Sequence, residues 1–214
     1  MRNISMRITE IISMTTKKAK VLFDGGSSLV LYKGELKKLH WQEESEVDQA
    51  EYDRVRKEIV EKRAKLYAMR LLQDQDRTEK EITDKIKRAG YEPEIAQAAL
   101  DYVKGFGYVD DDRYAANYIE RARGSKSGRQ IRQDLIKRGI SSETVAAMLE
   151  EKTDEEDEYA AIVKLLKKRR FNPEAGEDLQ SAQKERDKQL RYLASKGFAY
   201  GSVRHVLDHW DEYE

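Results

Sequence analysis

The segment that decides the fold reads Tyr114-Ala115-Ala116-Asn117-Tyr118 and lies near the middle of a 214-residue chain. Two other segments begin with the same Tyr-Ala pair and continue to an apolar residue: Tyr67-Ala68-Met69-Arg70-Leu71 and Tyr159-Ala160-Ala161-Ile162-Val163. The three starts lie 47 and 45 residues apart. A period of about 45 residues is typical of helical repeat proteins, so the sequence predicts three copies of one helical unit.

Each copy also contains a glycine with apolar residues at fixed distances around it. The glycines are Gly90, Gly139 and Gly197. The apolar residues stand four positions before, one position after and ten positions after the glycine: Ile86, Leu135 and Leu193; Tyr91, Ile140 and Phe198; Leu100, Leu149 and Leu207. Glycine readily adopts the positive φ that often ends a helix, and the apolar residue after it packs back on that helix. We therefore predict that each glycine ends the middle helix of its copy.

Polar residues mark the starts of the middle helices in the first two copies. Thr78 and Ser127 each stand twelve residues before the glycine of their copy, and Glu81 and Gln130 follow them by three residues. This spacing predicts two capping boxes. The third helix begins at residues suited to a helix N-terminus, Pro93 in the first copy and Ser141 or Ser142 in the second. Each copy is thus predicted to contain three helices.

The first forty residues have a different pattern. Residues 6–12, 20–23 and 29–32 are rich in β-branched or other apolar residues, and the Gly-rich stretch 24–28 separates the last two. This pattern predicts an antiparallel ribbon of two or three strands. Such a small ribbon is marginal alone, so it must pack on the helices that follow. From Asp48 to Leu72 the apolar spacing predicts one long helix, or two in tandem.

The fold class that follows is mainly α, with three tandem three-helix repeats and a small N-terminal β-prone segment. Charged residues make up 38% of the chain, against about 25% in an average globular protein. With little apolar material per copy, we expect the copies to share one core and to form an elongated, curved array. The third copy is irregular and carries an insertion at 172–176. The expected divisions are a hairpin-like segment 1–42, a leading helix 43–63, and repeats 64–110, 111–152 and 153–214.

Several kinds of chemistry are not supported by the sequence. The chain has no cysteine, which excludes disulfides and thiolate nucleophiles. His205 and His209 could share a metal ion, but the only other histidine is the distant His40. Asp110, Asp111 and Asp112 fit the solvated start of a helix. We expect no catalytic residues, no cofactor and no metal, and we expect a cytoplasmic monomer without membrane contact.

Charge is balanced overall, with 41 basic and 41 acidic residues, but it is sorted into blocks. The segment 150–158 carries seven acids and one lysine, and five cations follow between Lys164 and Arg170. From Asp112 to Ile140, the middle copy carries eight basic residues against three acidic ones: Arg113, Arg121, Arg123, Lys126, Arg129, Arg132, Lys137 and Arg138. These eight are the predicted partner-facing or DNA-facing residues. The alternative is that they pair with acids on adjacent helices, and we expect Tyr114 and Tyr118 beside them to belong to the core.

Two runs in the middle copy resemble the bacterial RecX family of regulatory proteins. The first is Gly107-Tyr108-Val109-Asp110-Asp111-Asp112-Arg113-Tyr114-Ala115, and the second extends from Arg129 to Ile140. The segment from Gln189 to Phe198 is similar to the last repeat of that family. The resemblance covers about residues 60 to 210, and the third repeat departs from it by its insertion.

The resemblance implies a non-enzymatic protein that binds the RecA recombinase and the RecA–DNA filament. It implies inhibition of RecA ATP hydrolysis, of strand exchange and of the coprotease function behind the SOS response, and thus a role in recombinational DNA repair. Direct contact with DNA would be weak. The alternative function is a helical DNA-binding or RNA-binding protein, such as a helix-turn-helix transcription regulator. The zero net charge counts against that alternative, because autonomous DNA binders usually carry a basic domain.

Overall fold

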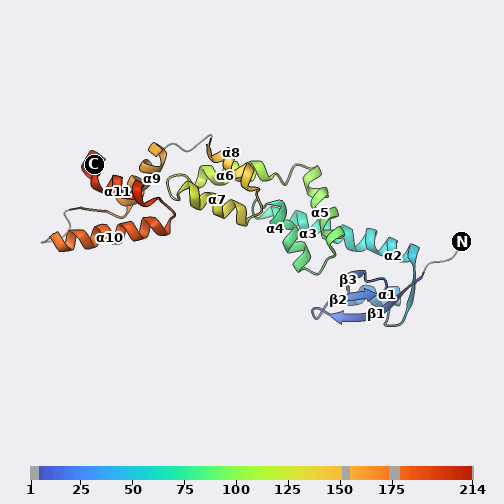
Figure 1. Ribbon diagram of the computed structural model, residues 1–214. Coiled ribbons are helices and arrows are strands. Elements are labelled where there is room, and N and C mark those ends of the chain that lie inside the picture. The colour runs from blue at the N-terminus through green and yellow to red at the C-terminus, as the bar shows by residue number, and fades with distance from the viewer. Residues whose placement is uncertain (1–4, 151–154, 174–178, 214) are drawn as a thin grey trace. The chain divides into compact units, whose positions relative to one another are not determined.

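The computed structural model is mainly helical and describes residues 5–150, 155–173 and 179–213 (Figure 1). The chain divides into two compact units, Met1–Asp110 and Asp111–Glu214. Residues 174–176 of the predicted insertion and residues 151–154 of the acidic block lie outside the described residues.

The first unit begins with a four-stranded antiparallel sheet in the order β3-β2-β1-β4. Its strands are β1 (Ser5–Ser13), β2 (Lys18–Phe23), β3 (Ser28–Tyr32) and β4 (Glu46–Asp48). The predicted ribbon is confirmed: Val21 pairs with Leu29, and Gly26 in the turn has a φ of 79°. A positive φ at this position explains the Gly-rich turn.

Two elements of this region depart from the prediction. The segment 1–42 contains a helix, α1 (Lys33–Leu39), as well as its strands. The expected leading helix 43–63 starts with strand β4, in which Val47 pairs with Met6, and becomes helical only at Gln49. A three-residue strand is too short to show an alternating pattern of apolar residues. Its pairing with β1 depends on residues some forty positions away, so the neighbouring sequence does not reveal it.

The helical stretch predicted from Asp48 to Leu72 is continuous from Gln49. It consists of α2 (Gln49–Val55), a π-helical turn η1 (Arg56–Glu61) and α3 (Lys62–Gln73). Helix α3 is followed by α4 (Glu79–Arg88) and α5 (Pro93–Gly105), which complete the first three-helix domain.

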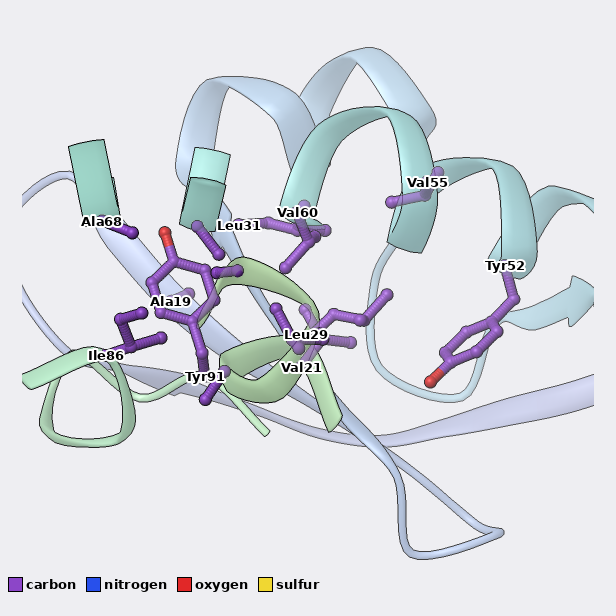
Figure 2. Close-up of a cluster of buried hydrophobic side chains, with 14 of the residues drawn as sticks. Ala19, Val21, Leu29, Leu31, Tyr52, Val55, Val60, Ala68, Ile86 and Tyr91 are labelled. Carbon is purple, nitrogen blue, oxygen red and sulfur yellow. The ribbon is translucent and has the colours of Figure 1, made fainter. Parts of the chain in front are cut away.

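One hydrophobic core joins the sheet to this domain. Figure 2 shows Leu31 of the sheet, Val60 of the π-helical turn and Tyr91 of the α4–α5 connection within a single cluster. Arg63 adds a polar link, since it donates to the carbonyl oxygen of Val30 at 3.0 Å. The expectation that the ribbon packs on the following helices is confirmed.

The second unit contains two further three-helix domains. The middle domain comprises α6 (Asp111–Ala122), α7 (Gly128–Lys137) and α8 (Ser142–Glu150). The third domain comprises α9 (Glu155–Lys168), α10 (Leu179–Ser195) and α11 (Tyr200–Asp208), and a short 3₁₀ turn η2 (Trp210–Glu212) follows.

The prediction of one shared core is wrong for this unit. Among the described residues, the middle domain has its own cluster around Ile119 and Leu135, and the third domain has a separate cluster around Ile162 and Leu193. A hydrogen bond joins the two domains: the hydroxyl of Ser127 donates to the carbonyl oxygen of Lys196 at 3.2 Å. Three short amphipathic helices can enclose a small core of their own, so the apolar side chains of these clusters pack within their own domain.

The predicted helix ends are confirmed. Gly90, Gly139 and Gly197 have φ values of 93°, 98° and 84°. The amides of Ile140 and Phe198 donate back to the carbonyl oxygens of Leu135 and Leu193, the hydrogen bond expected after a positive-φ residue.

Most of the predicted caps are confirmed. Thr78 and Glu81 form a complete capping box, and Ser141 accepts the amide of Thr144 at 3.0 Å. The second predicted capping box is only half present. Ser127 accepts the amide of Gln130, but the Gln130 side chain donates to Asp134. No helix in the described part of the chain combines the length and the apolar character needed to cross a membrane.

Candidate partner-binding site

The eight basic residues of the middle domain lie on α6, in the turn between α6 and α7, on α7 and directly after it. Helix α6 ends at Ala122, whose carbonyl oxygen accepts the amides of Ser125 at 3.0 Å and Lys126 at 3.1 Å. Gly124 within this turn has a φ of 70°. Ser127 then caps α7 through the amide of Gln130 at 3.1 Å. The turn is therefore fixed by hydrogen bonds at both of its ends.

Lys126 forms a polar cluster with Tyr118 and Asp134, and all three residues are partly buried. Its Nζ lies 2.6 Å from Oδ2 of Asp134 and 2.7 Å from the hydroxyl oxygen of Tyr118, which itself donates to the same carboxylate at 2.7 Å. Burial alone would raise the pKa of Asp134, but hydrogen bonds from Lys126, Tyr118 and Gln130 outweigh it and lower that pKa to about 2. Hydrogen bonds to Asp134 and Tyr118 raise the pKa of Lys126. Lys126 thus connects the α6–α7 turn to Tyr118 of α6 and to Asp134 of α7.

Arg138 is also engaged within the domain. Its Nη1 donates to the hydroxyl of Tyr114 at 2.6 Å, and its guanidinium carbon lies 5.4 Å from the ring centre of Tyr118. A cation over an aromatic ring contributes about 0.5–1 kcal/mol at partly exposed sites. Tyr114 is buried, as expected, whereas Tyr118 is half-buried and keeps its hydroxyl in the polar cluster. For Lys126 and Arg138, the alternative of an intramolecular role is the better description.

The remaining predicted cations differ in their surroundings. Arg113, Arg121, Arg123, Arg129 and Lys137 are exposed, and Arg132 is half-buried. The Nε of Arg121 donates to the carbonyl oxygen of Asn117 on its own helix at 3.1 Å. Within the described part of the chain, the side chains of Arg129, Arg132 and Lys137 have no hydrogen bond and no ion pair. These three cations are the members of the set most available to a partner.

A pocket of about 800 Å³ brings four of the eight residues together. Arg123, Lys126, Arg129 and Arg132 line it, while Arg113, Arg121, Lys137 and Arg138 do not. Its lining also includes apolar side chains from both domains of the second unit, among them Ile119, Ile131 and Phe198. The structure therefore divides the predicted site into a pocket-lining half and a half that lies elsewhere on the domain.

Sequence reasoning did not place two contributors to this pocket. Lys164 of α9 lines it, as does the turn Gly197–Ala199 of the third domain. Lys164 was visible as the start of the basic run that ends at Arg170, but its separation from the middle repeat hid its position. In the sequence, Gly197 and Phe198 indicate only the end of a helix.

The other candidate residues from the sequence contact neighbouring side chains or lie at the start of a helix. The His205 ring stacks on Tyr159 at 4.8 Å, and the His209 ring lies 4.4 Å from His205. In the described ranges there is no group of three or more possible metal ligands. Asp111 and Asp112 lie in the first turn of α6, where acids are stabilised by the helix dipole.

Comparison with known proteins agrees with the three-domain arrangement. Sequence models of the first, second and third three-helix domains of RecX match residues 64–102, 110–149 and 155–207. The chain belongs to the RecX family. The family is one of regulatory proteins, and the resemblance noted in the sequence is confirmed.

Several curated relatives carry the name regulatory protein RecX. The protein from Caldanaerobacter subterraneus subsp. tengcongensis is 29% identical over 205 residues, covering 95% of this chain and 99% of the relative. The RecX of Vibrio vulnificus is 30% identical over 141 residues and that of Xanthomonas citri 33% over 138, covering 65% and 64% of this chain and 88% and 81% of the relatives.

Solved structures share the fold. A crystal structure of regulatory protein RecX aligns with a TM-score of 0.59 and 22% identity, covering 95% of this chain and 99% of the other. RecX from Lactobacillus salivarius aligns with a TM-score of 0.57 and 21% identity, covering 71% of this chain and 96% of the other. At these identities the likeness concerns the fold alone.

Proposed function

We propose that this RecX protein binds the RecA recombinase and the RecA–DNA filament and inhibits RecA activity. The activities concerned are ATP hydrolysis, strand exchange and the coprotease function of the SOS response. We propose further that it acts in the cytoplasm as a monomer and without catalysis of its own. The observation that carries the proposal is the match of all three RecX domains, in order, along one chain.

Within the chain, we propose the middle domain as the contact surface. Arg129 and Arg132 lie on α7 and have no intramolecular partner among the described residues. Such cations are free to exchange water for carboxylates or phosphates of a partner, and charged rim contacts of this kind mainly raise the association rate. Lys126 and Arg138 are assigned to structural roles instead, because Asp134 and Tyr114 already hold them.

The test is the single-stranded-DNA-dependent ATPase of RecA, measured with and without the protein. We expect inhibition by the natural chain and at least about tenfold weaker inhibition by Arg129→Glu/Arg132→Glu, since charge reversal replaces attraction by repulsion. The matched control is Lys87→Glu/Arg88→Glu, which makes the same charge change at two exposed residues at the end of α4. Circular dichroism establishes that both variants fold.

Each outcome of this experiment has a defined meaning. An unchanged RecA ATPase with the natural chain would reject the proposed function. Full inhibition by the folded Arg129→Glu/Arg132→Glu variant would reject the proposed surface and leave the function in place. Equal loss in both variants would indicate a general charge effect and would also reject the surface.

A further inference from the structure

The pocket of the second unit has the size and wall of a small-molecule site. Its volume of about 800 Å³ lies within the range of roughly 300–1,000 Å³ typical of such sites. Its lining includes several apolar residues, among them Ile119, Ile131, Leu149 and the exposed Ala160. Part of the wall is therefore apolar, which favours a ligand with an apolar or flat aromatic body.

The charged groups around this wall are mainly cationic. Arg123, Lys126, Arg129, Arg132 and Lys164 line the pocket, against the two carboxylates of Asp157 and Glu158. Glu158 is occupied at the start of α11, where it accepts the amide of Ala199 at 3.4 Å and the hydroxyl of Ser202 at 3.3 Å. Lys126 is already paired with Asp134, and the remaining excess of positive charge favours a ligand with more than one negative charge.

Three of the five cations have no partner within the described part of the chain: Arg129, Arg132 and Lys164. Lys164 lies over the α6–α7 turn, because a methyl group added to Gly124 would lie 3.3 Å from its Cδ and 3.4 Å from its Nζ. The ammonium group is thus close to the turn that leads into α7. The arginines enter from the first two turns of the same helix.

Backbone donors add to these cations. Helix α7 has ten residues, and Ser127 accepts only the amide of Gln130 at its N-terminus. The amides of Gly128 and Arg129, both in the pocket lining, have no acceptor among the described residues. Free amides at a helix N-terminus together with the helix dipole favour phosphate. Amides and guanidinium groups are the donors that bind phosphate oxygens most specifically.

We propose that this pocket binds a nucleoside diphosphate or triphosphate. The phosphates lie at the start of α7 between Arg129, Arg132 and Lys164, and the base lies on the apolar part of the wall. A single carboxylate of a peptide would leave two of the three free cations without a partner. A nucleic-acid chain carries one charge per bridging phosphate, so each of its phosphates brings less charge than the terminal diphosphate or triphosphate of a nucleotide.

The experiment is isothermal titration of the full-length protein, alone and without Mg²⁺, with ATP, ADP, inorganic tripolyphosphate and adenosine. RecA is absent, so failure here is distinct from failure of the proposed regulatory function. We expect saturable binding of ATP and ADP, weaker binding of tripolyphosphate and the weakest binding of adenosine. Arg129→Gln/Arg132→Gln and Lys164→Gln should each weaken ATP binding by at least about tenfold, because each removes charge-assisted hydrogen bonds.

The matched control is Arg113→Gln/Lys137→Gln, which removes two cations of the same domain that do not line the pocket. We expect its affinity for ATP to stay within about twofold of the natural chain, because neither residue lines the pocket and solvent-exposed charges outside it are screened by salt. Absence of saturable ATP binding, unchanged binding by Arg129→Gln/Arg132→Gln, or equal loss in the control would overturn the proposal. Tripolyphosphate binding as tightly as ATP would overturn the placement of the base. Tighter binding of a short oligothymidylate than of ATP would assign the pocket to nucleic-acid ends.

Discussion

The hydroxyl of Ser127 occupies the space beside Gly197, so that a methyl group on Gly197 would lie only 2.6 Å from Ser127 Oγ. The same hydroxyl donates to the carbonyl oxygen of Lys196 at 3.2 Å and accepts the amide of Gln130 at 3.1 Å. One serine therefore starts helix α7 and also holds the end of helix α10. Gly197 is required there both for its positive φ and for close approach.

Replacement of Gly197 by alanine tests this double requirement. We expect Gly197→Ala to lower the free energy of unfolding by about 2 kcal/mol or more, since strain at positive φ and steric overlap add together. Gly107→Ala is the control, because Gly107 has a φ of 70° and nothing within 4 Å of an added methyl group. It should cost about 1 kcal/mol.

Urea unfolding followed by circular dichroism measures both values. In a Ser127→Ala background the 2.6 Å overlap is removed and the 3.2 Å approach to Gln130 Cβ remains, so the cost of Gly197→Ala should fall toward that of Gly107→Ala. Equal costs for the two glycine variants in the natural background would contradict the close contact.

Shortly after helix α9 an arginine adopts the positive φ that glycine adopts after α4, α7 and α10. Arg170 has a φ of 55°, and the amide of Phe171 donates back to the carbonyl oxygen of Leu166 at 3.0 Å. We expect Arg170→Gly to raise the free energy of unfolding by up to about 1 kcal/mol, because the left-handed conformation strains any residue with a Cβ. Arg170→Ala keeps that strain and should bring no gain. A glycine variant no more stable than the alanine variant in urea unfolding would refute this account.

The depressed pKa of Asp134 predicts a loss of stability in acid. A carboxyl group with a lowered pKa in the folded state stabilises it fully above the unfolded pKa of 3.8, and this contribution disappears as the pH falls toward about 2. We expect Asp134→Asn to be less stable at pH 7 by about 1 kcal/mol, since one neutral amide oxygen replaces the two charged oxygens that accept from Lys126, Tyr118 and Gln130. Its stability should then fall less than that of the natural chain between pH 4 and 2. Parallel pH profiles of the urea midpoints would mean that Asp134 is not the responsible group.

Salt dependence separates the proposed function from direct nucleic-acid recognition. We expect weak binding to bare single-stranded or double-stranded DNA, falling by at least about tenfold between 50 and 200 mM salt, because such binding rests on phosphate contacts. RecA–DNA filaments should be bound more tightly at every salt concentration. Fluorescence anisotropy with labelled DNA measures both. Equal affinity for bare DNA and for filaments would favour the helix-turn-helix alternative.

Local signals in the sequence were sufficient for the helix ends. Gly139 and Gly197 could be assigned to positive φ, and Thr78 to a cap, because helix ends depend on residues within one turn. Strand β4 could not be found this way, because Val47 is held in the sheet by Met6. For the second repeat, Gln130 was expected to complete a capping box, but Asp134 on the next turn offers a competing acceptor.

By itself, the sequence determined the number of three-helix domains, the C-terminal ends of their middle helices and the family, because periodic apolar residues and caps act over a few residues. Only the tertiary structure decided which cations are available. It placed Lys126 and Arg138 against Asp134 and Tyr114 and left Arg129 and Arg132 without partners in the described part of the chain. It also brought Lys164 beside the α6–α7 turn. These pairings depend on how helices from different parts of the chain pack, and charge order along the chain does not specify that.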